Sequence, residues 1–305
     1  MIQLNVSNET APLRHVVLGT AEACGPTPTA VQAYDPKSLD HILAGTYPVE
    51  ADMVPQMESV RAVLEKHGVA VHRPQVKTDV NQIFARDIGF VIEDKLFRSN
   101  IIDQRAEEFD AVLPVLQAAI PGLQVVKIPD HVSVEGGDVL LDGDAIFVGT
   151  YSGDDFDTYM SCRTNPAAVE YLQAQFPSKT VRGFDLIKSN TDGKANVLHL
   201  DCCFQPVGHG GALLCADAFA HPEDAAYLRD RYGAEHVFAL TMDQVYDMKA
   251  NLFSISPEVV ISDHSFTEVN AWLTGRGIHV ETVDYSEISK QGGLFRCSTF
   301  PLQRS

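Results

Sequence analysis

The sequence has 305 residues, 45% of them hydrophobic and 21% charged, which is enough to bury one large core or two modest ones. Its 41 acidic residues outnumber 23 basic ones, and the formal charge of −18 argues against nucleic acids and anionic membranes as partners. No apolar run approaches roughly 20 residues, and the start of the sequence does not resemble a signal peptide. The six cysteines lack paired metal-ligand spacing. We therefore expect a soluble cytoplasmic protein.

The first elements are a strand, a long irregular stretch and a helix. An apolar strand is predicted at 13–19, followed by 20–49, which contains four prolines. A connection of that length in a compact domain is typical of a lid or a binding loop, and we interpret 20–49 as a lid. A helix is predicted over 53–67 because its apolar residues share one face and Gly68 ends it. A strand follows at 69–72.

From residue 84 onward one unit recurs: a strand with acidic or histidine residues, a tight turn, an apolar strand, a helix and a closing strand. The predicted strand pairs are 84–92 with 95–99, 134–141 with 145–149, 197–207 with 212–216, and 251–255 with 259–262. The predicted helices lie near 104–119, 166–175, 222–232 and 266–275. The predicted closing strands are 125–128, 180–183, 237–240 and 280–283.

Counting the opening pair of strands, the chain contains five such units at a period of about 50 residues, which is typical of a propeller or a stacked array. A last strand at 293–302 would return to complete the first unit. Closing the ring in this way removes exposed sheet edges. We therefore expect one α/β domain over residues 1–305, with functional residues at the central end of each unit.

The predicted first strands hold an unusual set of charged residues: Arg86, Asp87, Glu135, His199 and Asp201. Residues two apart in a strand face the same way, so His199 and Asp201 are expected to point to one side. Units arranged around an axis would bring these residues together with Cys297. Each also has an ordinary interpretation: Asp87 pairs with Arg86, Glu135 begins a bulge, and His199 is a hydrogen-bonded core histidine.

Cys297 follows a glycine pair and a short apolar stretch near the C-terminus. A thiol attacks only as the thiolate, so a nucleophilic cysteine is expected in a partly exposed, electropositive setting with a histidine within reach. An unpaired cysteine is more often simply buried in the core, and from this stretch alone that alternative stays open.

Five motifs together carry a specific resemblance. They are Phe-Ala-Arg-Asp at 84–87, Glu-Gly-Gly-Asp at 135–138, Arg-Thr-Asn at 163–165, His-Leu-Asp at 199–201 and Arg-Cys-Ser-Thr-Phe-Pro-Leu at 296–302. Their order resembles that of the guanidino-group-modifying enzymes: arginine deiminases, dimethylarginine dimethylaminohydrolases and amidinotransferases. The resemblance runs from about residue 80 to the C-terminus. It implies a five-bladed α/β propeller, the pentein fold, in agreement with the repeat count.

The resemblance also implies catalytic roles. Cys297 would attack the guanidinium carbon and form a covalent thiouronium intermediate. His199 would protonate the departing amine and then deprotonate the incoming water. Glu135 would orient the imidazole and stabilise its charge.

The substrate-binding residues implied by the resemblance are mainly acidic. Asp87 and Asp201 would hold the guanidinium nitrogens, because carboxylates match a planar fork of donors. Arg163 would grip the α-carboxylate of the substrate, although a surface arginine that caps a helix is an equally good interpretation. Arg86 is included among the substrate-binding candidates as the neighbour of Asp87.

Three functions fit this pattern. The first is hydrolysis of a C–N bond in a guanidino or ureido compound, giving a ureido product plus ammonia or an alkylamine; Glu135-Gly136-Gly137 and an aspartate at position 87 favour it. The second is amidino transfer to an amine acceptor. The third is a catalytically silent, ribosome-associated binding protein of the same fold, which the charge of −18 does not favour.

The sequence predicts no cofactor and no metal, since it has neither metal-ligand spacing nor a phosphate-binding or nucleotide fingerprint. The expected partner is a small cationic guanidino compound, with arginine, methylated arginine, agmatine and citrulline all left open. A homo-oligomer is left open as well.

Overall fold

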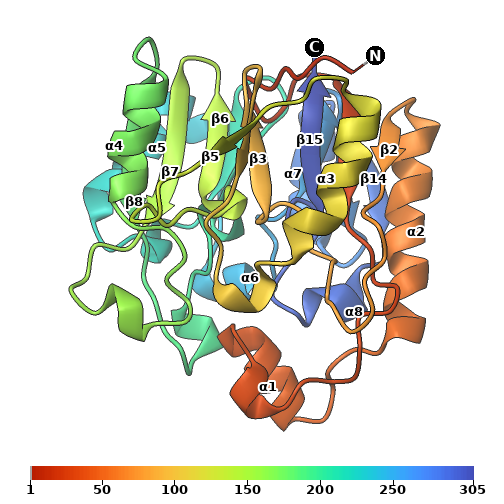
Figure 1. Ribbon diagram of the computed structural model, residues 1–305. Helices are drawn as coiled ribbons and strands as arrows, with labels where there is room; N and C mark the ends of the chain where they lie inside the picture. Colours follow the sequence, from red (N-terminus) through yellow and green to blue (C-terminus); the bar gives the residue numbers. More distant parts are fainter. Residues whose placement is uncertain (1) are drawn as a thin grey trace.

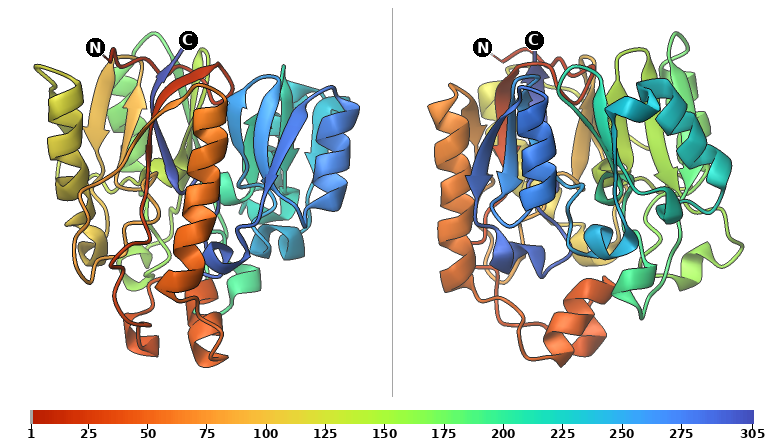
Figure 2. Two further views of the ribbon diagram at one scale, coloured as in Figure 1. Left: turned by 90° about the vertical axis from the view of Figure 1, so that its right-hand side faces the viewer. Right: turned by 180° about the vertical axis from the view of Figure 1, so that it is seen from behind.

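The computed structural model describes residues 2–305 and consists of five three-stranded sheets arranged around a common centre, with the longer helices on the outside (Figures 1 and 2). In every sheet the middle strand runs antiparallel to one neighbour and parallel to the other. The predicted five-unit α/β propeller is therefore confirmed.

The two ends of the chain form one sheet together. β15 (Thr299–Arg304) pairs antiparallel with β1 (Leu13–Leu18), and β1 pairs parallel with β2 (Ala70–His72). The backbone N–H of Arg304 also donates to the carbonyl of Asn5 at 2.7 Å, and the termini lie side by side in Figure 1. The last strand thus closes the ring, as the sequence predicts, although it begins at residue 299 and not at 293.

The other four sheets follow the chain in order. Their strands are β3 (Gly89–Ile92), β4 (Lys95–Arg98) and β5 (Val125–Lys127); β6 (Val139–Asp142), β7 (Ala145–Thr150) and β8 (Thr180–Asp185); β9 (Phe204–Val207), β10 (Gly211–Leu214) and β11 (Val237–Ala239); β12 (Phe253–Ser256), β13 (Val259–Asp263) and β14 (His279–Val283). β7 is buried along its whole length, as expected for a central strand covered on both faces. Gly143, at a φ of 64°, makes the predicted turn between β6 and β7.

The helices cover the outer ends of the sheets. The longer ones are α2 (Glu50–Lys66), α3 (Glu108–Ala119), α4 (Ala167–Gln175), α5 (Pro222–Tyr232) and α7 (Thr267–Gly275), all close to prediction. The sequence did not predict α6 (Met242–Tyr246) and α8 (Ser286–Ser289), which are little more than one turn long. Short helices of this kind lack the repeated apolar spacing on which the prediction depends.

The segment 20–49 contains a helix, α1 (Pro36–Leu43), that the sequence-based interpretation missed. Its start has a clear local cause: the carboxylate of Asp35 accepts a hydrogen bond from the N–H of Ser38 at 2.8 Å, and Pro36 occupies the first helical position. α1 projects from the lower end of the propeller in Figure 1. The segment is therefore a helical arm and not an irregular loop.

The charged motifs do not lie in strands, which corrects the prediction. Residues 84–88 form a turn, and Gly136–Asp138 and Leu200–Cys202 form single 3₁₀ turns, each ending where the first strand of its sheet begins. Side chains in such compact turns do not alternate between two faces, so the argument that placed His199 and Asp201 on one side was wrong. The turns still occupy equivalent positions in successive sheets, which brings their side chains together.

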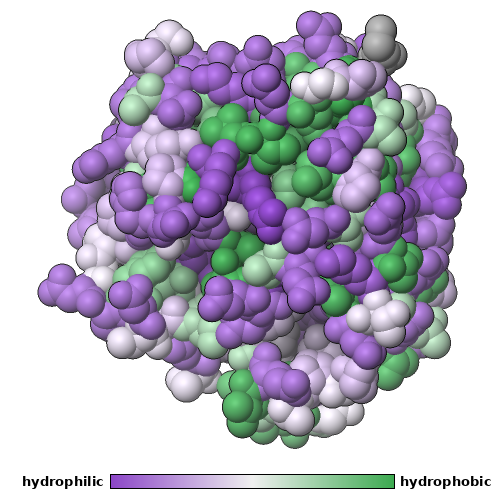
Figure 3. Space-filling view, in the orientation of Figure 1, coloured by the Kyte–Doolittle hydropathy of each residue, from purple (hydrophilic) through white to green (hydrophobic). Residues whose placement is uncertain are grey.

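Much of the exterior in Figure 3 is hydrophilic, as the charge predicts. Five large apolar side chains are exposed among residues 2–305, and the three most exposed belong to the segment 20–49: Val31, Leu43 and Val49, at 95%, 70% and 51% exposure; the other two are Val76 and Met160. Among residues 2–305, no helix combines the length and the apolar character needed to cross a bilayer.

A buried ion cluster joins the N-terminal segment to the turn that precedes β15. The Arg296 side chain donates from Nε and Nη2 to the two carboxylate oxygens of Glu9, at 3.1 and 3.0 Å, and from Nη1 to Asp201 at 2.8 Å. Arg86 and Arg304 are buried close by, so Glu9 is enclosed by positive charge. Burial alone would raise the pKa of Glu9, but the charges of Arg296 and Arg86 outweigh it and lower the pKa to about 2.

The substitution Glu9→Gln is expected to destabilise the fold by about 3 kcal/mol at neutral pH, because it leaves buried arginines without their carboxylate. A carboxyl whose folded-state pKa is depressed contributes stability above its unfolded pKa and loses it as pH falls. The deficit of the variant should therefore shrink between pH 4.5 and about 2. Urea unfolding at several pH values measures it, with the exposed Glu258→Gln as control. A deficit that does not change with pH would contradict this account.

Candidate active site

Three charged side chains from successive sheets meet in a buried group. His199 Nε2 lies 2.8 Å from Glu135 Oε2, and His199 Nδ1 lies 3.7 Å from Asp87 Oδ1. All three are at most 3% exposed. The propeller thus brings together residues that are separated by more than a hundred positions in the sequence.

The acidic surroundings of His199 determine its protonation. Burial would lower the pKa of His199, but the negative charges of Asp87 and Asp138 and the hydrogen bond and charge of Glu135 outweigh it and raise the pKa to about 9. Burial would raise the pKa of Glu135, but Arg163 and His199 lower it to about 2. At neutral pH the pair is therefore an imidazolium with a carboxylate, and His199 holds a proton that it is able to donate.

Asp87 has a partner that the sequence analysis missed. Arg105 Nη1 donates to Asp87 Oδ2 at 2.6 Å, and the same guanidinium forms two bonds with Glu108, at 2.7 and 2.8 Å. Asp87 is thus paired with Arg105 and not with its neighbour Arg86. The spacing of Arg105 and Glu108 is that of an ion pair on a helix, a signal available in the sequence but common on surfaces. Asp87 Oδ1 has no hydrogen-bond partner among residues 2–305.

Cys297 lies in the turn before β15, and its surroundings differ from the prediction. It is 3% exposed, and its Sγ lies 3.8 Å from Asp201 Oδ2. Burial and the negative charges of Asp201 and Asp87 raise the pKa of the Cys297 thiol well above the ordinary value. The expected electropositive, partly exposed setting was wrong, because the residues that crowd the sulfur are acidic. When no cationic ligand is bound, Cys297 is therefore a neutral thiol.

Asn251 positions Cys297 and was also missed. Its Nδ2 donates to Cys297 Sγ at 3.2 Å, and its Oδ1 accepts from the Cys297 N–H at 3.1 Å. Asn251 precedes β12 as Asp87 precedes β3. The repeat therefore contained the signal, since the fourth unit had to contribute a polar residue at the equivalent position.

The glycine pair of the Glu-Gly-Gly-Asp motif fits the site closely. A Cβ at Gly137 would lie 2.7 Å from the His199 ring and 2.8 Å from Asp87 Oδ1, and one at Gly136 would lie 2.1 Å from the carbonyl of Arg86. No side chain is accommodated at either position. Glycine here allows the backbone to approach the histidine, and the predicted bulge is a 3₁₀ turn.

The remaining predicted residues are engaged with protein partners. Asp201 Oδ2 accepts from Arg296, while its Oδ1 has only sulfur contacts, at 3.6 Å to Cys202 and 4.0 Å to Cys297. Arg86 donates to the carbonyl of Arg296 at 3.3 Å and is buried near Glu9 and Arg304. The substrate-binding role of Arg86 stays a prediction.

Arg163 has three protein partners and is 2% exposed. Its Nη1 donates to Glu135 at 3.1 and 3.3 Å, Nη2 to the carbonyl of Tyr34 at 2.6 Å, and Nε to the carbonyl of Met160 at 2.7 Å. The surface helix-capping alternative is therefore wrong. Gripping a substrate carboxylate would require Arg163 to leave these partners, so that role stays a prediction.

The described residues include one buried set with metal-ligand chemistry, formed by Asp87, Glu135 and His199, whose ligand atoms lie within 4.8 Å of one another. Their carboxylates are already paired with Arg105 and Arg163, and the His199 nitrogens both face carboxylates. The guanidinium groups of Arg105 and Arg163 thus already neutralise the carboxylates that a metal ion would need as ligands.

Comparisons with known proteins identify the family of the chain and relatives with the same fold. Residues 47–304 match the family described as N,N dimethylarginine dimethylhydrolase, eukaryotic. The uncharacterized protein YkgA of Bacillus subtilis (strain 168) is 33% identical over 242 residues, which are 79% of this chain and 77% of that protein. Among solved structures, the N-terminal domain of ArgZ with a covalently bound reaction intermediate covers 95% of this chain and 98% of its own, at a TM-score of 0.77 and 17% identity. The inosamine-phosphate amidinotransferase StrB1 of Streptomyces griseus covers 100% of this chain and 98% of its own, at a TM-score of 0.73 and 18% identity.

Replacing Glu135 with Gln is expected to lower the pKa of His199 below about 9, because the variant loses a negative charge and a charged hydrogen-bond acceptor. NMR titration of the His199 ring measures the change, with the resonance assigned by its loss in His199→Asn. Glu170→Gln, which changes an exposed carboxylate on α4, should leave that pKa unchanged. A His199 pKa that is the same in Glu135→Gln and the parent protein would refute the assignment.

Proposed function

Because the chain belongs to the N,N dimethylarginine dimethylhydrolase family, we propose that it hydrolyses a C–N bond of a guanidino, arginine-like compound, with Cys297 as nucleophile. The product is a ureido compound plus ammonia or an alkylamine. The observation that carries the proposal is a buried carboxylate oxygen, Asp87 Oδ1, that lacks a partner beside His199. Such an oxygen is costly to bury unless a donor is supplied, and a guanidinium supplies several.

Charge balance supports a cationic substrate. Asp87, Glu108 and Glu135 carry three negative charges, which Arg105, Arg163 and protonated His199 neutralise. A guanidinium that enters adds one positive charge next to the Cys297 thiol. Loss of the thiol proton to solvent restores neutrality, so the substrate itself lowers the cost of forming the thiolate. The nucleophile is then generated where and when the substrate is bound.

In the first half of the reaction the S–C bond forms between Cys297 and the guanidinium carbon, giving a tetrahedral adduct. The C–N bond to the departing amine then breaks, and His199 donates its proton to that nitrogen. The product of this half is a thiouronium cation on Cys297, and His199 is left neutral. Asp87 and Asp201 remain as acceptors for the two nitrogens that stay on the carbon.

In the second half His199 takes a proton from water as the water oxygen bonds to the thiouronium carbon. Collapse of this adduct breaks the C–S bond, releases the ureido product and returns the Cys297 thiol. Glu135 keeps the imidazole in place through both halves by its 2.8 Å hydrogen bond. The glycines at 136 and 137 leave no space for larger residues against the His199 ring. This close packing supports the Glu-Gly-Gly-Asp motif, and the preference for hydrolysis over amidino transfer rests on that motif.

Cys297→Ser is expected to lower turnover of asymmetric dimethylarginine, arginine or agmatine by about a thousandfold or more, because a hydroxyl does not ionise under the same conditions. Ammonia and dimethylamine release across these substrates measures the loss. The matched control is Cys24→Ser, which changes a half-buried cysteine outside the site. A Cys297→Ser enzyme within tenfold of the parent would refute the covalent mechanism.

Hydrolysis and transfer are expected to differ in the origin of the new oxygen. In heavy-oxygen water, the ureido product of a guanidino substrate should carry the label, and added glycine, lysine or ornithine should neither speed turnover nor divert product. Turnover that appears only with such an amine, and gives a new guanidino compound, would identify an amidinotransferase. Binding of a guanidino compound without any turnover would identify a silent binding protein.

A further inference from the structure

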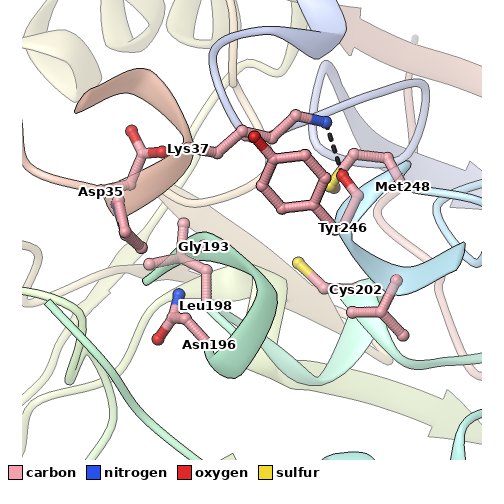
Figure 4. A pocket seen from close by; sticks show the side chains of 11 residues that line it. Asp35, Lys37, Gly193, Asn196, Leu198, Cys202, Tyr246 and Met248 are labelled. Carbon is pink, nitrogen blue, oxygen red and sulfur yellow. Dashed lines mark hydrogen bonds between the residues drawn. The ribbon is translucent and has the colours of Figure 1, made fainter. Parts of the chain in front are cut away.

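The segment 20–49 is fastened to the propeller by polar contacts. Lys37 Nζ on α1 donates to the carbonyl of Tyr246 on α6 at 2.6 Å and lies 5.0 Å from the centre of the Tyr246 ring. The Tyr246 hydroxyl in turn donates to Asp40 Oδ2 at 3.1 Å. Figure 4 shows Lys37 reaching across to Tyr246 above Cys202. These contacts form a latch between α1 and the body of the protein.

The contact between the segment and the body is incompletely packed. A cavity of about 30 Å³ lies between them, lined by residues that include Asp35, Lys37, Cys202 and Tyr246. Asp35, which lines this cavity, has a buried carboxylate oxygen, Oδ2, with no hydrogen-bond partner among residues 2–305. The buried residues of α1 are Pro36, Lys37 and Ser38, and Leu43 of the same helix is 70% exposed, so apolar burial contributes little to the docking of α1. A few polar bonds therefore decide whether it stays docked.

A chain of contacts leads from this segment to the catalytic histidine. The carbonyl of Tyr34 accepts from Arg163 Nη2 at 2.6 Å, and the Arg163 guanidinium lies 5.8 Å from the Tyr34 ring centre. Arg163 Nη1 donates to Glu135, and Glu135 is bonded to His199. Tyr34 is the residue before the cap of α1, so it moves with the helix.

We propose that Arg163 is the positioning residue through which docking of the segment 20–49 sets the charge balance at Glu135 and His199. With the segment docked, the carbonyls of Tyr34 and Met160 hold the guanidinium against the Glu135 carboxylate. When the segment leaves, Arg163 loses the Tyr34 acceptor and is free to turn away from Glu135. The undocked site is then more negative and attracts a cationic substrate, and docking restores neutrality around it.

The direction of the effect follows from the charges around each group. His199 faces Asp87, Asp138 and Glu135, while Glu135 faces Arg163, His199 and Arg105. Removing the positive charge of Arg163 leaves Glu135 less neutralised, so the pKa of His199 rises. Undocking acts in the same direction through the same residue. The catalytic meaning of this coupling rests on the proposed function, but the coupling itself is measurable without substrate.

The experiment is a double-mutant cycle read by NMR titration of His199 in the ligand-free protein. One arm, Lys37→Met with Tyr246→Phe, removes the latch without touching Arg163, and Arg163→Met removes the proposed link. Hydrogen exchange of the α1 amides should become at least tenfold faster in the latch variant. Its His199 pKa should rise, and in the Arg163→Met background the same latch substitutions should add no further rise.

The matched control is Lys194→Met. Lys194 also lies over the Tyr246 ring, at 5.8 Å, but it belongs to the body of the protein and is bonded to Asp243. It should change neither α1 exchange nor the His199 pKa. Faster α1 exchange with an unchanged His199 pKa would overturn the coupling, as would an equal rise with and without Arg163. Unchanged α1 exchange in the latch variant would overturn the latch.

Discussion

The structure depends on keeping a dense group of charges neutral away from water. Buried carboxylates at Asp87 and Glu135 are stable there because Arg105, Arg163 and the His199 imidazolium face them at hydrogen-bond distance. The same balance fixes His199 as a proton donor and keeps Cys297 neutral until another cation arrives. An unpaired charge of either sign would be costly there, so under the proposed function an entering guanidinium favours loss of the Cys297 proton. Under the proposed function, substrate binding and activation of Cys297 are therefore coupled electrostatically.

The propeller is what makes such a group possible. Each sheet begins with a compact turn near the centre, and the turns supply Asp87, Glu135, His199, Asn251 and Cys297 from five different units. The ring has to close for Cys297 to reach the others, because its turn precedes the strand that pairs with β1. The ion pair between Glu9 and Arg296, which precedes Cys297 in sequence, ties closure of the ring to the placement of Cys297. Stability and site geometry therefore share residues.

The sequence predicted the repeat, the ring closure and most helix positions, because apolar periodicity and turn residues are local signals. It placed the charged motifs in strands, and that error has a physical cause. A polar stretch directly before an apolar run has the same local signal as the first residues of a strand, and only the structure shows that it forms a turn. Arg105 was missed because its ion-pair spacing to Glu108 is common on surface helices, and Asn251 because its partner Cys297 is distant in sequence. The electropositive setting expected for Cys297 was wrong because the acidic residues around the sulfur come from other units. α1 was missed because four prolines concealed the capping signal at Asp35. Long-range charge pairing is the information that a single sequence lacks.

Burial and the negative charges of Asp201 and Asp87 keep Cys297 a neutral thiol at rest. The most direct test is the rate at which iodoacetamide alkylates Cys297 in the ligand-free protein as a function of pH, followed by mass spectrometry of the Cys297 peptide. The alkylation rate is expected to keep rising with pH beyond about 8.5, the pKa of an ordinary thiol. A rate that reaches its plateau below that value would mean a preformed thiolate and would contradict the claim.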